Sequence, residues 1–253
     1  MGSAASLERR DALYFAAGPA LVTLAAVAAF KIDPWPVPIP SQAQLLQPLP
    51  VTVILLLGIV GVALASRAGL PSAPDIRNGL AWRRLLFTSG GAGLAFGAIL
   101  LGLDATTGLT AGAAQALGVT WVNVPLPQSL PHYAAAGVLL ECLYRIIPIT
   151  LFVWLIGRVV LRGRGNTQVF WTLALLTSLI EPASQLALAR PGAATALTGL
   201  LILTFAANLF EAREFRKHGW PAPILFRLAF YSVWHCFGPY LMSEQSILYP
   251  GPN

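Results

Sequence analysis

Long runs of apolar residues alternate with short polar stretches along the whole chain. Seven runs stand out, at 12–30, 50–66, 84–103, 132–157, 167–188, 192–210 and 221–242. A helix needs about 20 apolar residues to cross the hydrocarbon core of a bilayer, and these runs approach or reach that length. The pattern predicts an all-α fold, a polytopic membrane helix bundle with about seven transmembrane helices.

The composition supports a membrane environment. Hydrophobic residues make up 56% of the 253 residues, charged residues make up 10%, and the mean hydropathy is +0.69. A soluble domain carries roughly 25% charged residues because its surface must be solvated. We therefore expect most of the surface to face the lipid bilayer. The net charge of +6 does not indicate nucleic acid, because the basic residues cluster between the apolar runs, as topology signals do.

Lys and Arg are divided unevenly between the two sides that seven spans would create. One side has only Lys31 and Arg190, with none in 104–131 and none after residue 242. The other side has Arg9, Arg10, Arg67, Arg77, Arg83, Arg84, Arg158, Arg162, Arg164, Arg213, Arg216 and Lys217. Because basic residues mark cytoplasmic loops, the N-terminus is expected in the cytoplasm and the C-terminus outside, in a multi-pass protein of the plasma (inner) membrane.

Residues 12–30 also resemble a secretory signal peptide, since Arg9 and Arg10 precede the run and Ala-Val-Ala at 26–28 suits a cleavage point. The run is longer than the usual apolar region of about 7–15 residues, and no polar mature domain follows. We expect an uncleaved helix. The chain then divides into a three-helix transmembrane region with an outer loop, 1–131, and a four-helix region, 132–253.

The third run and the segment after it carry packing and loop signals. Ser89, Gly93 and Gly97 recur at a spacing of four, which lets another helix approach closely. The segment 104–131 is long and predicts an interfacial helix near 111–122. That helix would belong either to a lid over an outward-facing cavity or to a plain surface loop.

Ionisable residues interrupt three of the last four runs. An ionisable side chain at bilayer depth costs at least ~2.5–3.5 kcal/mol on insertion scales, so each is a candidate functional residue. The candidates are Glu141 and Arg145 in the fourth run, Glu181 in the fifth, and Arg227, Tyr231 and His235 in the seventh. Two acids and two arginines predict a cluster that is neutral overall.

The spacing of these residues predicts that they converge. Glu141 and Arg145 are four apart and share one helix face, and the last helix repeats that spacing in one polar stripe. At a rise of about 1.5 Å per residue, Glu141 and Glu181 lie about 6 Å to the outer side of the midplane and His235 about 4–5 Å. Three groups able to move protons are thus expected in one layer.

A purely structural role is the alternative for each of these residues. Buried Glu–Arg pairs often only fix helix packing, and a histidine in an apolar helix often only satisfies a neighbour. A metal site is not expected, although Cys142 adjoins Glu141 and Cys236 adjoins His235, because neighbours on a helix point about 100° apart. No cofactor is expected.

Three segments of the second half carry a resemblance to a known family. They are Leu-Glu-Cys-Leu-Tyr-Arg at 140–145, Thr-Ser-Leu-Ile-Glu-Pro at 177–182, and Gly-Trp-Pro-Ala-Pro-Ile-Leu-Phe-Arg at 219–227, continuing to Tyr231. In order and spacing they resemble the motifs of the CAAX-protease and bacteriocin-processing (CPBP, or Abi) family of intramembrane glutamic endopeptidases. Those motifs are Glu-Glu-x-x-x-Arg, Phe-x-x-x-His and His-x-x-x-Asn. The resemblance covers residues 132–242.

The chain departs from this family at most motif positions. Leu140 stands where the family has its first glutamate, and Glu141 keeps the second. Glu181 aligns with the histidine of the second motif, and Arg227 and Tyr231 align with the histidine and asparagine of the third. Every position except Leu140 still holds a polar group.

The resemblance implies a CPBP-like core at 132–253 and an intramembrane peptidase activity on a membrane-anchored protein or peptide. Glu141 would be the general base for a water, held in place by Arg145, and His235 would polarise that water or stabilise the oxyanion. Glu181 would share a proton with Glu141 or orient His235. Two further side chains would contact the substrate, namely Arg227 and Tyr231.

Two other functions stay open. A catalytically silent CPBP-like scaffold would bind a partner membrane protein and use the polar cluster as a structural network, and Leu140 favours this alternative. The retained acids and His235 favour chemistry instead. A proton-coupled transporter would also use acids and histidine, but no inverted repeat supports it.

Overall fold

The computed structural model describes residues 2–71, 73–74 and 78–242, and all regular secondary structure in that part is helical. Helices occupy all seven predicted runs. The N-terminal region has α1 (Gly2–Ile32), α2 (Pro40–Leu45), α3 (Pro48–Ala68), α4 (Gly79–Leu85), the π-helix η1 (Leu86–Gly90), α5 (Gly91–Thr107) and α6 (Leu109–Leu117). The all-α prediction is confirmed.

The second half continues in the same way, with π-helical turns inside its long helices. Its elements are α7 (Ser129–Glu141), η2 (Cys142–Ile146), α8 (Ile147–Phe152), η3 (Val153–Val160), α9 (Asn166–Ser178), α10 (Ile180–Leu188), α11 (Ala194–His218), α12 (Pro221–Tyr231), η4 (Ser232–Phe237) and α13 (Gly238–Met242). A π-helix bonds residue i to i+5, so each η segment shifts the register of the side chains that follow it.

Four of the helices are long and apolar enough to cross a bilayer. They are Pro48–Ala68, Gly79–Thr107, Ser129–Val160 and Asn166–Leu188. Large apolar side chains also point away from the bundle, including Phe87 at 76% exposure and Ile202 at 63%. Such a surface is unfavourable in water and suits contact with lipid tails. Both observations indicate a membrane protein.

The end of α11 differs from the predicted boundary at residue 210. The helix continues to His218 because charged side chains do not end a helix, and Glu211 and Glu214 are buried against neighbouring helices. It ends before Gly219, whose φ of +83° suits glycine. Arg77 and residues 243–253, which entered the predicted topology, lie outside the described residues.

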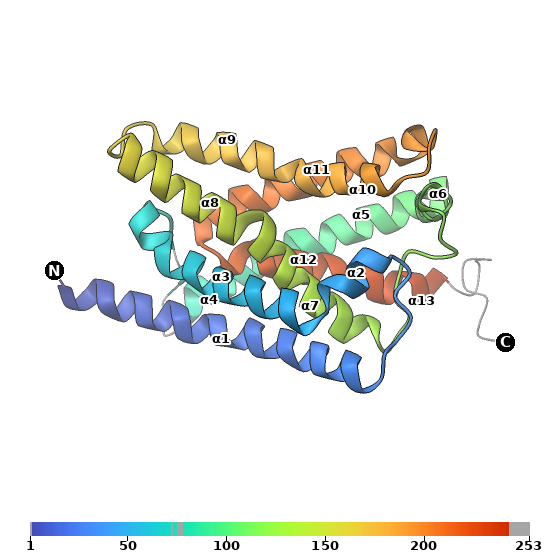
Figure 1. Cartoon of the computed structure of the whole chain (residues 1–253), viewed down its shortest axis with the longest axis horizontal. Coiled ribbons are helices and arrows are strands. Elements are labelled where there is room, and N and C mark those ends of the chain that lie inside the picture. The colour runs from blue at the N-terminus through green and yellow to red at the C-terminus, as the bar shows by residue number, and fades with distance from the viewer. Residues whose placement is uncertain (1, 72, 75–77, 243–253) are drawn as a thin grey trace.

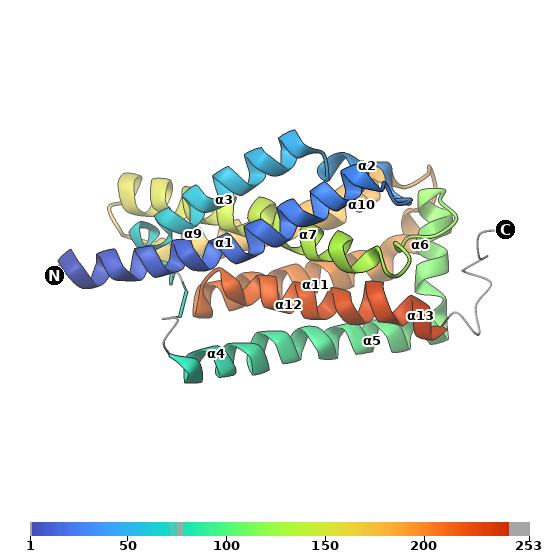
Figure 2. The same ribbon diagram turned by 90° about the horizontal axis from the view of Figure 1, so that it is seen from below.

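Helix α12 lies inside the bundle and contacts α5, α7 and α11. Figure 2 shows α4 and α5 along one edge beside α12 and α13, with α1 and α3 along the other. The start of α1 and the α8–α9 turn lie at one end of the bundle in Figure 1, and α6 lies at the other end. Figure 2 shows α6 lying across that end. It overlaps the helix predicted near 111–122, and its interfacial position stays a prediction.

The close approach predicted from Ser89, Gly93 and Gly97 is present where α5 packs against α12 and η4. A Cβ on Gly93 would meet the carbonyl oxygen of Phe226 in α12, and one on Gly97 would lie 2.8 Å from the Cβ of Val233 in η4. The distance between these helices is therefore one that only residues without a side chain, such as Gly93 and Gly97, allow.

Candidate functional site

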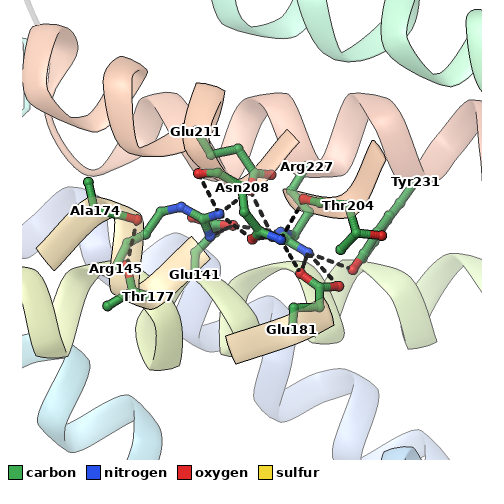
Figure 3. A network of polar contacts seen from close by, with 10 residues as sticks. All are labelled: Glu141, Arg145, Ala174, Thr177, Glu181, Thr204, Asn208, Glu211, Arg227 and Tyr231. Atoms are coloured by element: carbon green, nitrogen blue, oxygen red, sulfur yellow. Dashed lines mark hydrogen bonds and ion pairs between the residues drawn. The ribbon is translucent and has the colours of Figure 1, made fainter. Parts of the chain in front are cut away.

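Polar side chains from five helical segments, α7, η2, α10, α11 and α12, meet in the middle of the bundle around two buried arginines. Arg145 comes from η2 and Arg227 from α12, and both are almost fully buried. Figure 3 shows Asn208 between the two guanidinium groups. We call the following set the buried ionic cluster: Glu141, Arg145, Glu181, Asn208, Glu211, Arg227 and Tyr231.

Arg227 uses all five of its N–H groups within this cluster. Its Nε donates to Oε1 of Glu141 at 2.5 Å, and its Nη1 donates to Oε2 of Glu181 at 3.1 Å and to the hydroxyl of Tyr231 at 3.0 Å. Its Nη2 donates to Oδ1 of Asn208 at 3.0 Å and to Oε2 of Glu211 at 2.8 Å. The guanidinium has no donor left for another ligand.

Arg145 contacts three members of the same set. Its Nη1 donates to Oε1 of Glu141 at 2.8 Å, and its Nη2 is paired with Oε2 of Glu211 at 2.5 Å. The same Nη2 donates to both the main-chain oxygen and Oδ1 of Asn208. The predicted contact between Glu141 and Arg145 on one helix face is therefore present.

Glu141 is fully buried and is not among the residues that line the cavity described below. Its Oε1 accepts from Arg145 and Arg227 together, while its Oε2 has no hydrogen-bond partner. Two cations thus compete for one oxygen, and protein surrounds the other. This environment keeps bulk water away from the carboxyl group.

Asn208 and Glu211 belong to the cluster but were not singled out in the sequence. The predicted sixth run ended at residue 210, which placed Glu211 in a loop with the basic residues that follow. A predicted helix that continued past residue 210 would have placed Asn208 and Glu211 on one face, because they are three residues apart. Their polar character in a long apolar helix was the available signal.

A third acid joins the cluster. Glu211 adds a carboxyl group to those of Glu141 and Glu181 beside Arg145 and Arg227. The expectation of a neutral cluster counted only two acids and did not include Glu211, and the net charge of the cluster stays a prediction.

His235 has its side-chain hydrogen-bond contact with a residue outside the buried ionic cluster, and the layer that it was expected to share with Glu141 and Glu181 stays a prediction. Its Nδ1 lies 2.5 Å from Oδ1 of Asn123, an acceptor, and its ring stacks on Tyr133 at 4.4 Å. Its ring meets Tyr231 edge-on at 4.8 Å. The π-helix η4 begins at Ser232, so His235 does not simply continue the polar stripe of α12.

Glu141 and Glu181 reach the same arginine but from different helices, and each bonds Arg227 rather than the other. Glu181 also accepts from Nδ2 of Asn208 at 3.0 Å. Its side chain is 15% exposed, which makes it the more accessible of the two acids.

A cavity of about 560 Å³ adjoins the cluster. Glu181, Glu211, Arg227, Tyr231 and His235 all contribute to its wall. Most of the remaining wall is apolar, with contributions from α2, α5, α6, α7, α10 and α11. The cavity therefore joins a polar side to a larger apolar volume inside the bundle.

The geometry suits charge stabilisation better than proton transfer at Glu141. An arginine does not give up its proton in proteins, so neither guanidinium can act as a base. Cys142 and Cys236 are buried free thiols, and within the described residues no group of three or more His, Cys, Asp and Glu side chains is arranged to hold a metal ion.

Comparison with known proteins finds no relative of this chain. No model of a protein family matches it, and neither characterised proteins nor solved structures give a significant match. The likeness to the CPBP family rests on the three motif segments, and membership of that family stays a prediction.

Proposed function

We propose that this chain is a catalytically silent membrane protein with a CPBP-like core, which acts by binding a partner membrane protein. The observation that carries the proposal is the environment of Glu141. Its carboxylate is fully buried, its bonded oxygen is held by two arginines, and it does not reach the cavity.

This environment is unsuited to a general base. A base must lie within about 2.6–3.2 Å of the proton that it removes, or reach it through one water. Glu141 has no such path, and Arg227 stands where the resembled family has a histidine able to exchange protons. The buried ionic cluster is then a structural device that fixes how the helices of residues 132–253 pack.

A peptidase-like activity on a membrane-anchored substrate is the second candidate, favoured by one observation. Glu181, Tyr231 and His235 line the same cavity. Because Nδ1 of His235 faces an acceptor, its Nε2 is free to take a proton in the neutral ring. In this candidate Glu181 and His235 would activate the water, and Glu141 and Arg145 would only position the helices.

We further propose seven membrane spans, a cytoplasmic N-terminus, an outer C-terminus and location in the plasma (inner) membrane. The twelve Lys and Arg residues on the proposed cytoplasmic side, against two on the other side, support this arrangement. The proposal keeps 1–131 as the three-helix region and 132–253 as the CPBP-like core.

Measurement of membrane-protein fragments in cells separates the two candidates. Wild type is compared with Glu181→Gln and His235→Gln, and Glu214→Gln serves as the control because that glutamate is buried outside both cluster and cavity. We expect the same protein termini in every sample and the same proteins photo-cross-linked to the chain. A fragment that appears with wild type and Glu214→Gln, but not with Glu181→Gln at equal folded abundance, would overturn the silent function and support the peptidase.

A further inference from the structure

The cavity beside the buried ionic cluster has the size of a small-molecule site. Its volume of about 560 Å³ falls within the range of roughly 300–1,000 Å³ that such sites occupy. Phe96 and Leu100 of α5, Ala113 of α6 and Leu200 of α11 contribute to its apolar wall. The wall also includes the rings of Tyr133 and Phe230 and helix α2.

The polar side of this cavity offers carboxyl oxygens to a ligand. Glu181 and Glu211 are part of the wall, and the side chain of Glu181 is 15% exposed. A carboxylate that a ligand can reach inside a membrane protein favours a cationic head over an anionic one. Arg227, the cation in the same wall, has no free donor for an anion.

Unpartnered polar atoms in the same wall point independently to a ligand. His132 is 1% exposed and lines the cavity, and its Nε2 has no hydrogen-bond partner. Its Nδ1 accepts from the indole N–H of Trp35 at 3.4 Å, which places the proton on Nε2 as an unused donor. Oε1 of Gln185 and Oε1 of Gln42 are unused acceptors in the same wall.

We infer that the cavity binds an amphipathic molecule with a primary ammonium head. The ammonium lies beside Glu181, and Gln185 is one helical turn away on α10 to accept a second of its three N–H groups. Tyr231 and Phe230 supply aromatic faces near the cation. The apolar body fills the space toward α5 and α6, and His132 donates to an oxygen of the ligand.

This ammonium chemistry has two sources, a free single-chain amine and the headgroup of an ethanolamine lipid. The purified full chain in dodecyl maltoside is therefore melted with dodecylammonium, with lyso-phosphatidylethanolamine, and with dodecanol and dodecanoate at equal mole fractions in the micelle. We expect dodecylammonium, lyso-phosphatidylethanolamine or both to raise the melting temperature, and the alcohol and the carboxylate to leave it unchanged. Stabilisation by dodecylammonium alone assigns a free amine, and stronger stabilisation by the lipid assigns the headgroup.

Two variants make the test specific. Glu181→Gln should weaken ammonium binding about tenfold or more, because it removes the charge that faces the cavity. Leu200→Trp should abolish binding by filling the cavity while leaving every charge in place, which covers the case in which Glu181→Gln fails to fold. Glu214→Gln should bind like wild type. Equal stabilisation by amine, alcohol and carboxylate, no stabilisation by either ammonium compound, or unchanged binding in Leu200→Trp would each overturn the inference.

Discussion

Asn208 links the two buried arginines through a single amide group. Its Oδ1 accepts from both Arg145 and Arg227, and its Nδ2 donates to Glu181. An amide carries an acceptor and a donor on one small planar group, so it can bond guanidinium and carboxylate groups at the same time. Neither a carboxylate nor an apolar side chain can make all three contacts.

The first prediction concerns this amide. Asn208→Leu keeps the branched outline of the side chain, although leucine is larger, and leaves buried N–H groups of both arginines with fewer acceptors. We expect a loss of at least about 2 kcal/mol in the free energy of unfolding, since hydrogen bonds to charged groups contribute about 1.5–3 kcal/mol each. Thermal melting in detergent measures the loss. Thr204→Val, one turn away on the same helix, is the control and should lose much less; equal losses would contradict the bridging role.

The second prediction compares two buried glutamates under one substitution. Glu141→Gln removes the charge that balances two buried arginines, and breaking such a pair costs roughly 3–5 kcal/mol. Glu214→Gln should cost far less, because the Arg213 that Glu214 contacts is 47% exposed and can be solvated. Melting temperatures of both variants check the order. A wild-type melting temperature for Glu141→Gln would show that the cluster is not a structural device.

At the scale of single residues, the sequence identified the ionisable side chains that are costly to bury in a membrane. It missed the contacts that depend on the three-dimensional fold. Glu141, Arg145, Arg227 and Tyr231 could be paired because spacings of four on one helix are local. Contacts between helices depend on rotation about each axis, which apolar runs do not encode. Glu211 was missed for another reason, because the predicted sixth run ended at residue 210 while α11 continues to His218.

The π-helical turns show how elements control the direction of side chains. In η4 the wider turn means that His235 does not follow directly above Tyr231, and it bonds Asn123 instead. In η1, Ser89 is fully buried and donates to Oε2 of Glu214 at 2.7 Å. A periodicity of 3.6 residues applied to the whole span cannot anticipate these shifts.

Helix positions were easier to predict than helix ends. All seven apolar runs coincide with helices, because a span of apolar residues has a length that the bilayer dictates. The end of α11 could not be read in this way, since its last turns are amphipathic and buried on one side only. The capping residue Gly219 marks the end better than the change in hydropathy.

The third prediction tests the contact between α5 and η4. Gly97→Ala places a methyl group 2.8 Å from the Cβ of Val233, and such overpacking costs about 1–3 kcal/mol. Gly102→Ala, on the same helix with nothing within 4 Å, should be neutral or slightly stabilising because alanine favours a helix. The two melting curves measured side by side decide the matter; a stable Gly97→Ala protein would mean that the helices are not closely packed.

Across the whole molecule, the buried ionic cluster lies inside a largely apolar core, and many large apolar side chains are also exposed on the outside. Two of the helices that contribute to the cavity wall, α2 and α6, come from connecting segments rather than from the apolar runs. The sequence left open whether the segment 104–131 was a lid or a surface loop. Only the three-dimensional arrangement shows that α6 contributes to the cavity wall.

The fourth prediction concerns orientation in the membrane. In a chain in which Cys142 and Cys236 are replaced by alanine, single cysteines are introduced as Arg164→Cys, in the α8–α9 turn, and Thr120→Cys, after α6. An impermeant maleimide should label Thr120→Cys in intact cells and Arg164→Cys only after permeabilisation, because basic loops stay in the cytoplasm. Labelling of Arg164→Cys in intact cells would refute the proposed topology.

The place of Arg227 on the last long helix has a consequence for biosynthesis. A nascent chain that has inserted α7, α10 and α11 carries three glutamates but only Arg145 to balance them. Two of these acids have no arginine partner in the membrane until the ribosome has synthesised α12 with Arg227. We therefore expect the final helix to act as an assembly checkpoint, and chains truncated before residue 221 to be removed by membrane quality-control proteases.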